Sequence, residues 1–448
     1  MPTTIYDLSY AVNPRLGEQD ARLRPYQKAA VEQAVLGERK HVLLGHHPGK
    51  GKSAMALCIA KQVKLATQSV IIICPPSLKL QWARQCAVWA DGLSVGIYDS
   101  NASAAKWQEA NTDISIIPDS VVHSAPRLAG SIVIVDEVHR HKANKARRTL
   151  GVFGGWKFGP VEGMATGADR IIALTGTPIV ASPADIYPLL HCTGFTDANT
   201  FNEFCKKYCP PYDKFIGNHS VVCYDRPANL PMLNYKLRSS VLIRPRLEDY
   251  ETQVPLLTFD QFDVQVVDPA KRYSADEINN AMARGGIEES TSIAKMRREV
   301  GVAKAKQCIG AIADMIEGGE RPVVWCWHRE VTEIISASLG VKPIHGGVAT
   351  ADRVALVAAF VAGETNALVA SISAMGTGTD GIQHATDFCI FVEESFTPAE
   401  NEQAVARLDR MGQTKPVRVT RVISNSMIDA AVRRANDRKT HMSQETLK

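Results

Sequence analysis

A glycine-rich segment, HHPGKGKS at His46–Ser53, has the residue types needed to hold the phosphates of a nucleotide. It follows a short apolar run at Val42–Leu44 and precedes the helical pattern AMALCIAKQV, so it should join a strand to a helix. In that setting, glycines let backbone N–H groups approach phosphate oxygens at the positive end of the helix. We predict that Lys52 contacts the β- and γ-phosphates of ATP and that the Ser53 hydroxyl binds Mg²⁺. The rest of this predicted cofactor-binding loop is His47, Pro48, Gly49, Lys50 and Gly51.

Two carboxylates at the end of an apolar run form the second candidate group. The segment IVIVDEVHRHK begins with Ile132–Val135 and continues with Asp136 and Glu137. Charges at the end of a buried strand are costly unless they have partners, and a magnesium nucleotide supplies one. We predict that Asp136 holds Mg²⁺ and that Glu137 is the general base for the attacking water. The alternative interpretations are surface acids at a strand end and, at Lys52, a glycine loop before a lysine-rich helix.

Short β-branched runs that alternate with longer helical patterns predict the elements that position these groups. This alternation is typical of parallel sheets with crossover helices, in which ligands bind beyond the carboxyl ends of the strands. The sequence therefore predicts an α/β protein with two parallel sheets, each flanked by helices. The predicted strands are Val42–Leu44, Val70–Cys74, Ile114–Ile117, Ile132–Val135 and Ile171–Leu174 in the first half, and Val323–Trp327, Ala367–Ser371, Phe388–Val392 and Val417–Ile423 in the second.

Length and composition are those of a globular protein with two domains. A chain of 448 residues, 45% hydrophobic and 22% charged, exceeds what one core usually organises. An irregular region rich in proline and aromatic residues ends near Arg244–Pro255, so we predict domains at residues 1–250 and 251–448. The apolar runs are strand-sized and the amino terminus has no basic stretch before an apolar one. We therefore expect no membrane span, no secretory signal and a cytoplasmic location.

The ten cysteines and the mildly basic charge say less about function. Several cysteines lie in apolar runs, as expected for reduced thiols, and we expect no disulfides. A group at His191, Cys192, Cys205, Cys209 and Cys223 could supply a zinc site, but its spacings match no paired Cys-x-x-Cys pattern, and we interpret it as structural. The net charge of +4 permits a polyanionic partner without requiring one. The basic run Arg140–Arg148 is either a solvated face or a contact to a phosphate backbone.

The order of the motifs resembles helicase superfamily 2 and, more narrowly, the Swi/Snf-type double-stranded DNA translocases. The resemblance covers almost the whole chain and implies two tandem RecA-like lobes with the ATP site in the cleft between them. LRPYQ is similar to the adenine-recognition motif of the family, which implies that Arg24 and Gln27 contact the nucleotide. CPPSLKLQWARQ is similar to motif Ia, which implies that Ser77 and Lys79 lie near nucleic acid. LTGTP is similar to motif III, which couples the γ-phosphate to lobe movement, and this resemblance implies a nucleic-acid contact for Thr175.

The second half carries the remaining motifs of this family. VVWCWHREVTEII resembles motif IV, and the following IHGGVATADRVALVAAF implies nucleic-acid contacts for His345 and Gly346. SISAMGTGTDGIQHATDFCIF resembles motif V, which implies a nucleic-acid contact for Ser371 and nucleotide contacts for Gly378 and Asp380. QAVARLDRMGQ is similar to motif VI, in which Arg407 and Arg410 are the arginine fingers. An arginine donated across a cleft neutralises charge on the transferred phosphoryl group, so hydrolysis would require the lobes to close.

Some positions depart from the family pattern. His46 and His47 stand where the family has an acidic pair, Val138 replaces the alanine of DEAH, and Asp409 replaces a histidine between the two arginines. The stretch FNEFCKKYC at Phe201–Cys209 and the compact span between the predicted lobes resemble the small annealing-type subgroup. We expect a monomeric ATPase that uses ATP and Mg²⁺ and tracks along double-stranded DNA, in a bacterial or virus-infected cell. The alternatives are a strand-separating helicase on single-stranded DNA or RNA, and a nucleotide-gated binding module.

Overall fold

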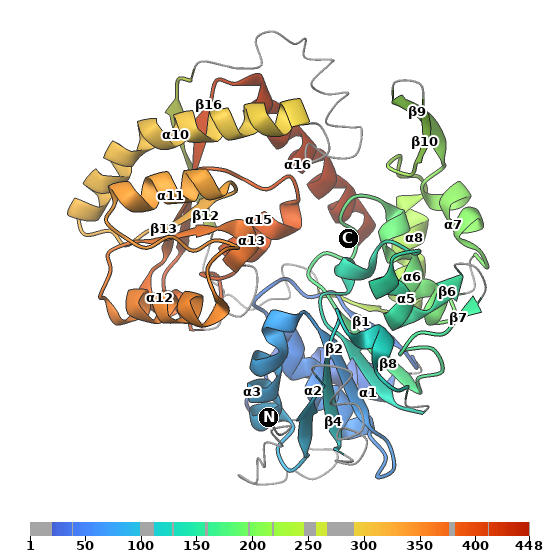
Figure 1. The fold of residues 1–448 in the computed structure, drawn as a ribbon. Coiled ribbons are helices and arrows are strands. Elements are labelled where there is room, and N and C mark those ends of the chain that lie inside the picture. The colour runs from blue at the N-terminus through green and yellow to red at the C-terminus, as the bar shows by residue number, and fades with distance from the viewer. Residues whose placement is uncertain are drawn as a thin grey trace. The chain divides into compact units, whose positions relative to one another are not determined.

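The computed structural model describes residues 20–37, 39–98, 112–127, 130–156, 160–195, 198–216, 219–245, 257–266, 291–375, 381–410 and 412–447. The chain divides into two compact units (Figure 1). The first comprises Met1–Asp213, Val222–Glu251 and Met442–Lys448, and the second comprises Lys214–Val221 and Thr252–His441.

A seven-stranded sheet organises the first unit, and every neighbouring pair of its strands is parallel. The order across the sheet is β11-β1-β8-β5-β2-β4-β3. The bounds are Leu242–Ile243 for β11, Val42–Leu44 for β1, Arg170–Leu174 for β8, Ile132–Val135 for β5, Val70–Cys74 for β2, Ile114–Pro118 for β4 and Val95–Ile97 for β3.

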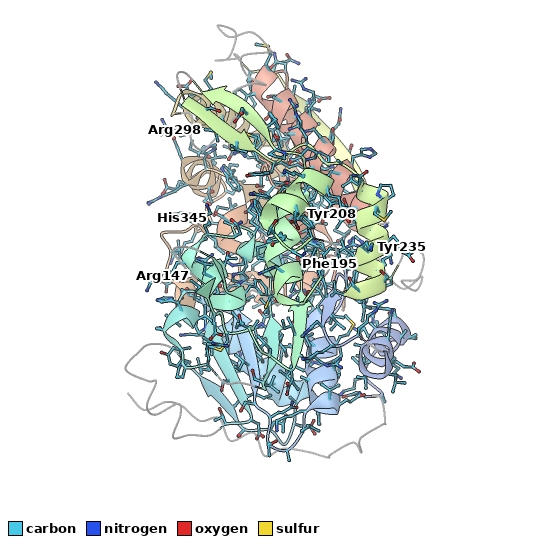
Figure 2. All side chains as sticks on the ribbon, turned by 90° about the vertical axis from the view of Figure 1, so that its right-hand side faces the viewer. Arg147, Phe195, Tyr208, Tyr235, Arg298 and His345 are labelled. Carbon is cyan, nitrogen blue, oxygen red and sulfur yellow. The ribbon has the colours of Figure 1, made fainter. Side chains whose placement is uncertain are left out.

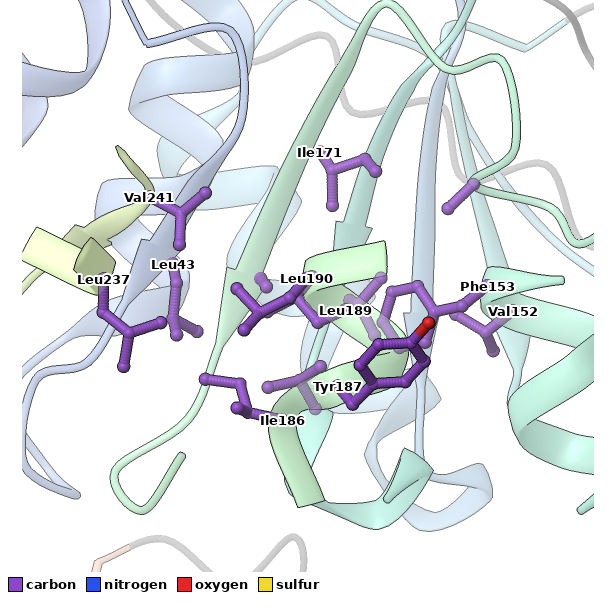
Figure 3. Packing of buried hydrophobic residues seen from close by; sticks show 14 of the residues in the cluster. Leu43, Val152, Phe153, Ile171, Ile186, Tyr187, Leu189, Leu190, Leu237 and Val241 are labelled. Atoms are coloured by element: carbon purple, nitrogen blue, oxygen red, sulfur yellow. The ribbon is translucent and has the colours of Figure 1, made fainter. Parts of the chain in front are cut away.

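Alternate residues of these strands enter two separate cores, because successive side chains of a strand point to opposite faces of the sheet. Leu43, Ile71 and Val133 lie in one core (Figure 3), and Val42 and Leu44 lie in the other. Both faces of the sheet are therefore apolar, as is usual for a parallel sheet covered on both sides. Burying one such side chain contributes about 2 kcal/mol of transfer free energy.

Helices cover each face of this sheet. The core that contains Val42 and Leu44 also takes side chains from α1 (Pro25–Leu36), α2 (Lys52–Val63) and α3 (Lys79–Trp89). The core that contains Leu43 takes side chains from α5 (Arg147–Phe153), α6 (Tyr187–Cys192), α7 (Phe201–Tyr208) and α8 (Leu230–Ser240). Figure 2 labels Arg147 at the start of α5 and Tyr235 on α8, and both side chains are exposed.

Short 3₁₀ turns and hairpins complete the first half of the chain. The turns are η1 (Pro76–Leu78), η3 (Val122–Ser124), η4 (Val138–His141) and η5 (Pro183–Ile186). Antiparallel β6 (Gly155–Trp156) and β7 (Pro160–Val161) form one small ribbon, and β9 (Tyr212–Ile216) pairs with β10 (His219–Cys223) in another.

A five-stranded parallel sheet organises the second unit, in the order β12-β16-β15-β13-β14. Its strands are β12 (Leu257–Val264), β13 (Val323–Cys326), β14 (Leu368–Ser371), β15 (Phe388–Phe391) and β16 (Val417–Ser424). One face packs against α10 (Thr291–Glu317) and α11 (Arg329–Ser338), and the other packs against α12 (Thr350–Ala362), α14 (Ile382–Ala385) and α15 (Pro398–Val405). The described residues also form α13 (Ile372–Met375) and α16 (Met427–Leu447).

The predicted α/β class, with parallel sheets flanked by helices, is confirmed. All nine predicted strands are present to within one residue at either end. Three strands of the two sheets, β3, β11 and β12, were not predicted, nor were the ribbon strands β6, β7, β9 and β10. β3 and β11 have only three and two residues, and β12, LTFDQFDV, is largely exposed and mixes charged with apolar residues. In the described part of the chain, no helix is both long and apolar enough to span a bilayer.

Candidate nucleotide site

The carboxyl ends of the parallel strands bring four sequence motifs to one edge of the first sheet. Leu44 of β1 pairs with Leu174 of β8, and Val135 of β5 pairs with Ala173 of β8. The loops that begin at Gly45, Thr175 and Asp136 therefore leave the sheet at nearly the same height along its strands. Gly45 and Thr175 are nevertheless 130 positions apart in the sequence. The loop after β2, which leads into η1 and α3, follows next in the sheet order. Ligands of open α/β sheets bind at this edge.

The predicted phosphate loop connects β1 to α2 through two glycines with positive φ. Gly49 has φ 76° and Gly51 has φ 78°, a conformation that side chains other than glycine rarely adopt. Gly51 precedes α2, so Lys52 and Ser53 occupy the first turn of that helix, where backbone N–H groups have no helical acceptor. The Lys52 ammonium donates to the backbone carbonyls of His46 at 2.9 Å and His47 at 3.2 Å. Together these groups give the loop the positive charge and N–H donors that suit phosphate.

The segment similar to the adenine-recognition motif packs against this loop. Gln27 is buried, and its amide Nε2 donates to the Lys50 carbonyl at 3.0 Å. The Tyr26 hydroxyl donates to the same carbonyl at 3.2 Å, and the Arg24 N–H donates to Gln27 Oε1 at 2.8 Å. Gln27 thus supports the phosphate loop directly, and its contact with a base remains a prediction, as does the role of Arg24.

Asp136 and Glu137 follow β5 in a buried setting. The indole N–H of Trp82, on α3, donates to Asp136 Oδ2 at 2.8 Å, and the Glu137 N–H donates to Asp136 Oδ1 at 2.9 Å. Burial, together with the adjacent Glu137 carboxylate, raises the pKa of Asp136 to about 7. Glu137 has a left-handed backbone, with φ 48°, a conformation that costs a non-glycine residue about 1 kcal/mol. The charge of a divalent cation would offset that of the buried Asp136 and the half-buried Glu137.

His139 joins the segment with Asp136 and Glu137 to LTGTP, the segment similar to motif III. His139 Nδ1 lies 3.2 Å from Glu137 Oε2 and 3.0 Å from Thr175 Oγ1. The Thr175 hydroxyl also accepts from the Thr177 N–H at 3.0 Å. The imidazole therefore bridges the loop after β5 and the loop after β8. Burial lowers the pKa of His139 to about 4, with help from nearby Arg140, so the ring is neutral at pH 7.

In the second unit, the residues predicted to contact nucleic acid lie at the carboxyl edge of its own sheet. The Ser371 N–H donates to the Ile344 carbonyl at 2.8 Å, which places Ser371 beside the segment containing His345 and Gly346. His345 Nδ1 accepts from the Gly347 N–H at 3.1 Å, and its Nε2 lies 3.6 Å from a Glu333 carboxylate oxygen. Figure 2 labels His345.

The two predicted arginine fingers follow α15. Arg407 is buried, and burial lowers the pKa of the Arg410 guanidinium, although an arginine remains charged at any physiological pH. α15 packs against α13, which directly follows Ser371. Gly378 and Asp380, predicted to contact the nucleotide, lie outside the described residues.

Asp119 anchors part of the basic run that follows Glu137. This buried carboxylate, at the end of β4, accepts from Arg140 Nε at 3.0 Å and lies 3.6 Å from Arg148 Nε. The other cations of the run, Lys142, Lys145 and Arg147, are exposed. One acid therefore holds two arginines in place and leaves an exposed basic surface beside the candidate site.

All ten cysteines are free thiols, and eight of them are buried. Burial raises the pKa of Cys58, Cys86 and Cys192 to about 12, so these thiols stay protonated. Among the described residues, no three histidine, cysteine or acidic side chains cluster in a way that could hold a metal ion. The alternative of a zinc site gains no support from this part of the chain.

Sequence reasoning missed three residues of this site: Trp82, His139 and Arg244. Trp82 and His139 lie within the segments CPPSLKLQWARQ and IVIVDEVHRHK, yet nothing in their spacing indicates a partner. Arg244 lies after a strand of two residues and donates to the Gly45 carbonyl, 199 positions away. Such contacts leave no periodic signal in a single sequence.

Comparisons with known proteins agree with this geometry. The SNF2-related domain family matches residues 26–258, just over half of the chain, and the helicase conserved C-terminal domain matches residues 303–412. The two matched domains define the class, that of a helicase-type ATPase core. The chain belongs to the SNF2-related domain family, which confirms the resemblance seen in the motifs.

Relatives are similar over nearly the whole chain. The SWI/SNF-related matrix-associated actin-dependent regulator of chromatin subfamily A-like protein 1 of Xenopus laevis is 26% identical, over 94% of this chain and 43% of the relative. The DNA annealing helicase and endonuclease ZRANB3 of Bos taurus is 25% identical, over 95% of this chain and 41% of the relative. This chain thus spans under half the length of these relatives. A solved structure, the Sulfolobus solfataricus SWI2/SNF2 ATPase core in complex with dsDNA, has a TM-score of 0.44 and 18% identity, covering 90% of this chain and 88% of that one.

Buried histidines around the site make the stability of the first unit sensitive to acid. Burial, with Lys52 and Arg244 nearby, lowers the pKa of His46 to about 3. Burial likewise lowers the pKa of His47 and His141 to about 3. The unfolded chain, with an ordinary histidine pKa of about 6.5, binds more protons than the folded chain between about pH 3 and 6.5. Stability is therefore fully present above pH 6.5 and is lost as the pH falls.

His46→Gln should reduce this acid sensitivity. Between about pH 7.5 and pH 5, the free energy of unfolding of the variant should fall by about 2 kcal/mol less than that of the wild type, because one buried imidazole no longer resists protonation. Urea unfolding at the two pH values measures the difference. The exposed His191→Gln variant is the control and should keep the wild-type pH dependence. An undiminished fall in His46→Gln would contradict the assignment.

Proposed function

We propose that this chain is an ATP-driven motor that tracks along double-stranded DNA. The observation that carries the proposal is the convergence of the phosphate loop, Asp136, Glu137 and Thr175 at one sheet edge, in a chain of the SNF2-related family. We further propose that residues 1–250 and 251–448 form two RecA-like lobes and that ATP binds in the cleft between them.

Each group at the edge has a role in phosphoryl transfer to water. Lys52 contacts the β- and γ-phosphates, and the N–H groups around Gly49 and Gly51 hold the phosphate oxygens. Ser53 and Asp136 would hold Mg²⁺, which when bound neutralises charge on the phosphate oxygens. Glu137 accepts a proton from the attacking water, and the neutral His139 orients that carboxylate and links it to Thr175. Arg407 and Arg410 neutralise the charge that develops on the transferred phosphoryl group.

Nucleic acid is the proposed partner of the surfaces next to this site. Ser77 and Lys79 in the first unit, and His345, Gly346 and Ser371 in the second, would contact the phosphate backbone. Double-stranded DNA is favoured because the relatives include a protein named as a DNA annealing helicase and a solved ATPase core in complex with dsDNA. We propose that the protein acts as a monomer in the cytoplasm of a bacterial or virus-infected cell.

Glu137→Gln should abolish turnover while leaving nucleotide binding nearly intact. The amide keeps the shape of the side chain but cannot accept the proton, so the hydrolysis rate should fall by about 10²- to 10⁴-fold. A phosphate-release assay and the affinity for a fluorescent ADP analogue measure the two effects separately. The exposed Glu299→Gln variant serves as the control. Normal hydrolysis in Glu137→Gln would show that the base has been assigned wrongly.

Arg410→Ala should also lose hydrolysis, although Arg410 is far from the phosphate loop in the sequence. Removing a guanidinium that neutralises transition-state charge should lower the rate by about 10³-fold. The exposed Arg298, whose ion pair with Glu330 has an N–O distance of 3.5 Å, provides the matched control as Arg298→Ala. Equal activity of the two variants would remove Arg410 from the catalytic group.

The nucleic-acid dependence of ATP hydrolysis tests the choice of partner. We expect duplex DNA to stimulate the steady-state rate more than single-stranded DNA or RNA of the same length, and added salt to weaken the stimulation because phosphate contacts release counterions. Strong stimulation by RNA alone would overturn the duplex-tracking proposal. If all three polymers bind but none changes the rate of ATP hydrolysis, the result would instead favour a nucleotide-gated binding module.

A further inference from the structure

Arg244 makes three contacts at the candidate site that the motifs do not account for. It follows β11, the edge strand next to β1. Its Nη1 donates to the Gly45 carbonyl at 2.6 Å and to the Gly176 carbonyl at 3.1 Å, and its Nη2 lies 3.2 Å from His47 Nε2. Gly45 and His47 belong to the segment after β1, and Gly176 belongs to the loop after β8. One guanidinium therefore joins the phosphate loop to the loop that carries Thr175.

The two loops also approach each other too closely for side chains at the contact points. A Cβ atom at Gly176 would lie 2.7 Å from Pro48 Cδ and 2.9 Å from Pro48 Cγ. A Cβ atom at Gly45 would lie 2.7 Å from Leu242 Cδ1 and 3.5 Å from Arg244 Cβ. The backbone of Gly176 is thus packed against the Pro48 ring, and that of Gly45 against the Leu242 side chain. The Gly45 and Gly176 carbonyls at these tight contacts need a donor that reaches both.

The chemistry of the arginine side chain suits this position. A planar guanidinium presents five N–H donors in a fixed fork and can serve two carbonyls and a ring nitrogen at once. A lysine ammonium carries the same charge on a flexible stem, without the fork. The positive charge also adds to that of Lys52 at a place where phosphate is expected.

His47 must be neutral to complete this arrangement. The guanidinium can only donate, so His47 Nε2 has to accept, which requires the tautomer with its proton on Nδ1. The surroundings enforce that state, because burial, with Arg244, Lys52 and Lys50 nearby, lowers the pKa of His47 to about 3. Arg244 therefore needs a hydrogen-bond acceptor at position 47 to complete its contacts.

We infer that Arg244 is a positioning residue for nucleotide binding: it fixes the phosphate loop against the Thr175 loop, so that the loop N–H groups and Lys52 meet the triphosphate in a preset geometry. Arg244 acts through the loops and need not touch the nucleotide. The inference rests on the proposed ATP site and adds a specific residue to it.

Arg244→Lys tests the inference in the full chain, with a fluorescent N-methylanthraniloyl ADP as the probe and Mg²⁺ present. The lysine keeps the positive charge but lacks the forked donors of the guanidinium. The dissociation constant of the probe should therefore rise by about tenfold. Arg39→Lys is the matched control: Arg39 also donates to two backbone carbonyls, of Leu242 and Arg238, in the same part of the sheet, but not to the phosphate loop. This control should bind the probe within about twofold of wild type, even where its melting temperature falls as much as that of Arg244→Lys.

Variants at position 47 separate positioning from loss of structure. His47→Leu removes the acceptor for Arg244 and should weaken binding of the probe more than His47→Gln, which keeps an acceptor. Combining Arg244→Lys with His47→Leu should weaken binding by less than the product of the single effects, because both remove the same contact.

The outcomes distinguish this inference from the proposed function. If wild-type protein binds the probe and Arg244→Lys binds it equally well, or if Arg39→Lys is weakened as much as Arg244→Lys, the positioning role is wrong and the ATP site stands. If the wild type itself does not bind the probe, the proposed nucleotide site fails first. A tenfold loss confined to Arg244→Lys and His47→Leu supports the inference.

Discussion

The common direction of the seven strands is the constraint on which the first unit depends. Because every strand pair is parallel, all carboxyl ends meet at one edge, and residues more than a hundred positions apart lie at the same level there. The same arrangement requires apolar cover on both faces, which α1 to α3 provide on one side and α5 to α8 on the other. Polar groups can then gather only at the ends of the strands. The location of the chemistry thus follows from the direction of the backbone.

Placing charged groups together at this edge costs electrostatic free energy, and the chain limits that cost by using neutral imidazoles there. His46, His47 and His139 each have a lowered pKa, chiefly because of burial, so they fill space without adding charge. The rings of His47 and His139 also make hydrogen bonds. The positive charge comes from Lys52 and Arg244, and the negative charge from Asp136 and Glu137. The histidine pair at positions 46 and 47, a departure from the family pattern, is compatible with the arginine contact because a neutral ring can accept from it.

Most of the fold could be predicted from the sequence, since buried parallel strands such as Val70–Cys74 are continuous apolar runs whose bounds are visible in the residues themselves. β11 could not, because two residues have no periodicity, and its place beside β1 depends on a pairing across 199 positions. Among the residues at this edge, Asp136 and Glu137 could be placed because they stand where β5 ends, and Lys52 because it begins a helix after a glycine-rich loop. Their catalytic roles stay predictions. The bond from Gln27 to the Lys50 carbonyl and the contacts of Arg244 depend on tertiary packing, which a single sequence does not reveal. The roles of Arg407 and Arg410 depend on how the units meet and stay predictions.

The hydrogen bond from the Trp82 indole to Asp136 makes the fluorescence of Trp82 sensitive to the state of that carboxylate. An indole whose N–H donates to a buried carboxylate emits according to the charge on that carboxylate, and Trp82 is one of only six tryptophans in the chain. A cation that arrives at Asp136 would draw electron density from the same oxygen atoms and shift the emission of this ring. Binding of the proposed Mg²⁺ at Asp136 would then be followed by intrinsic fluorescence, with no label attached and no turnover required.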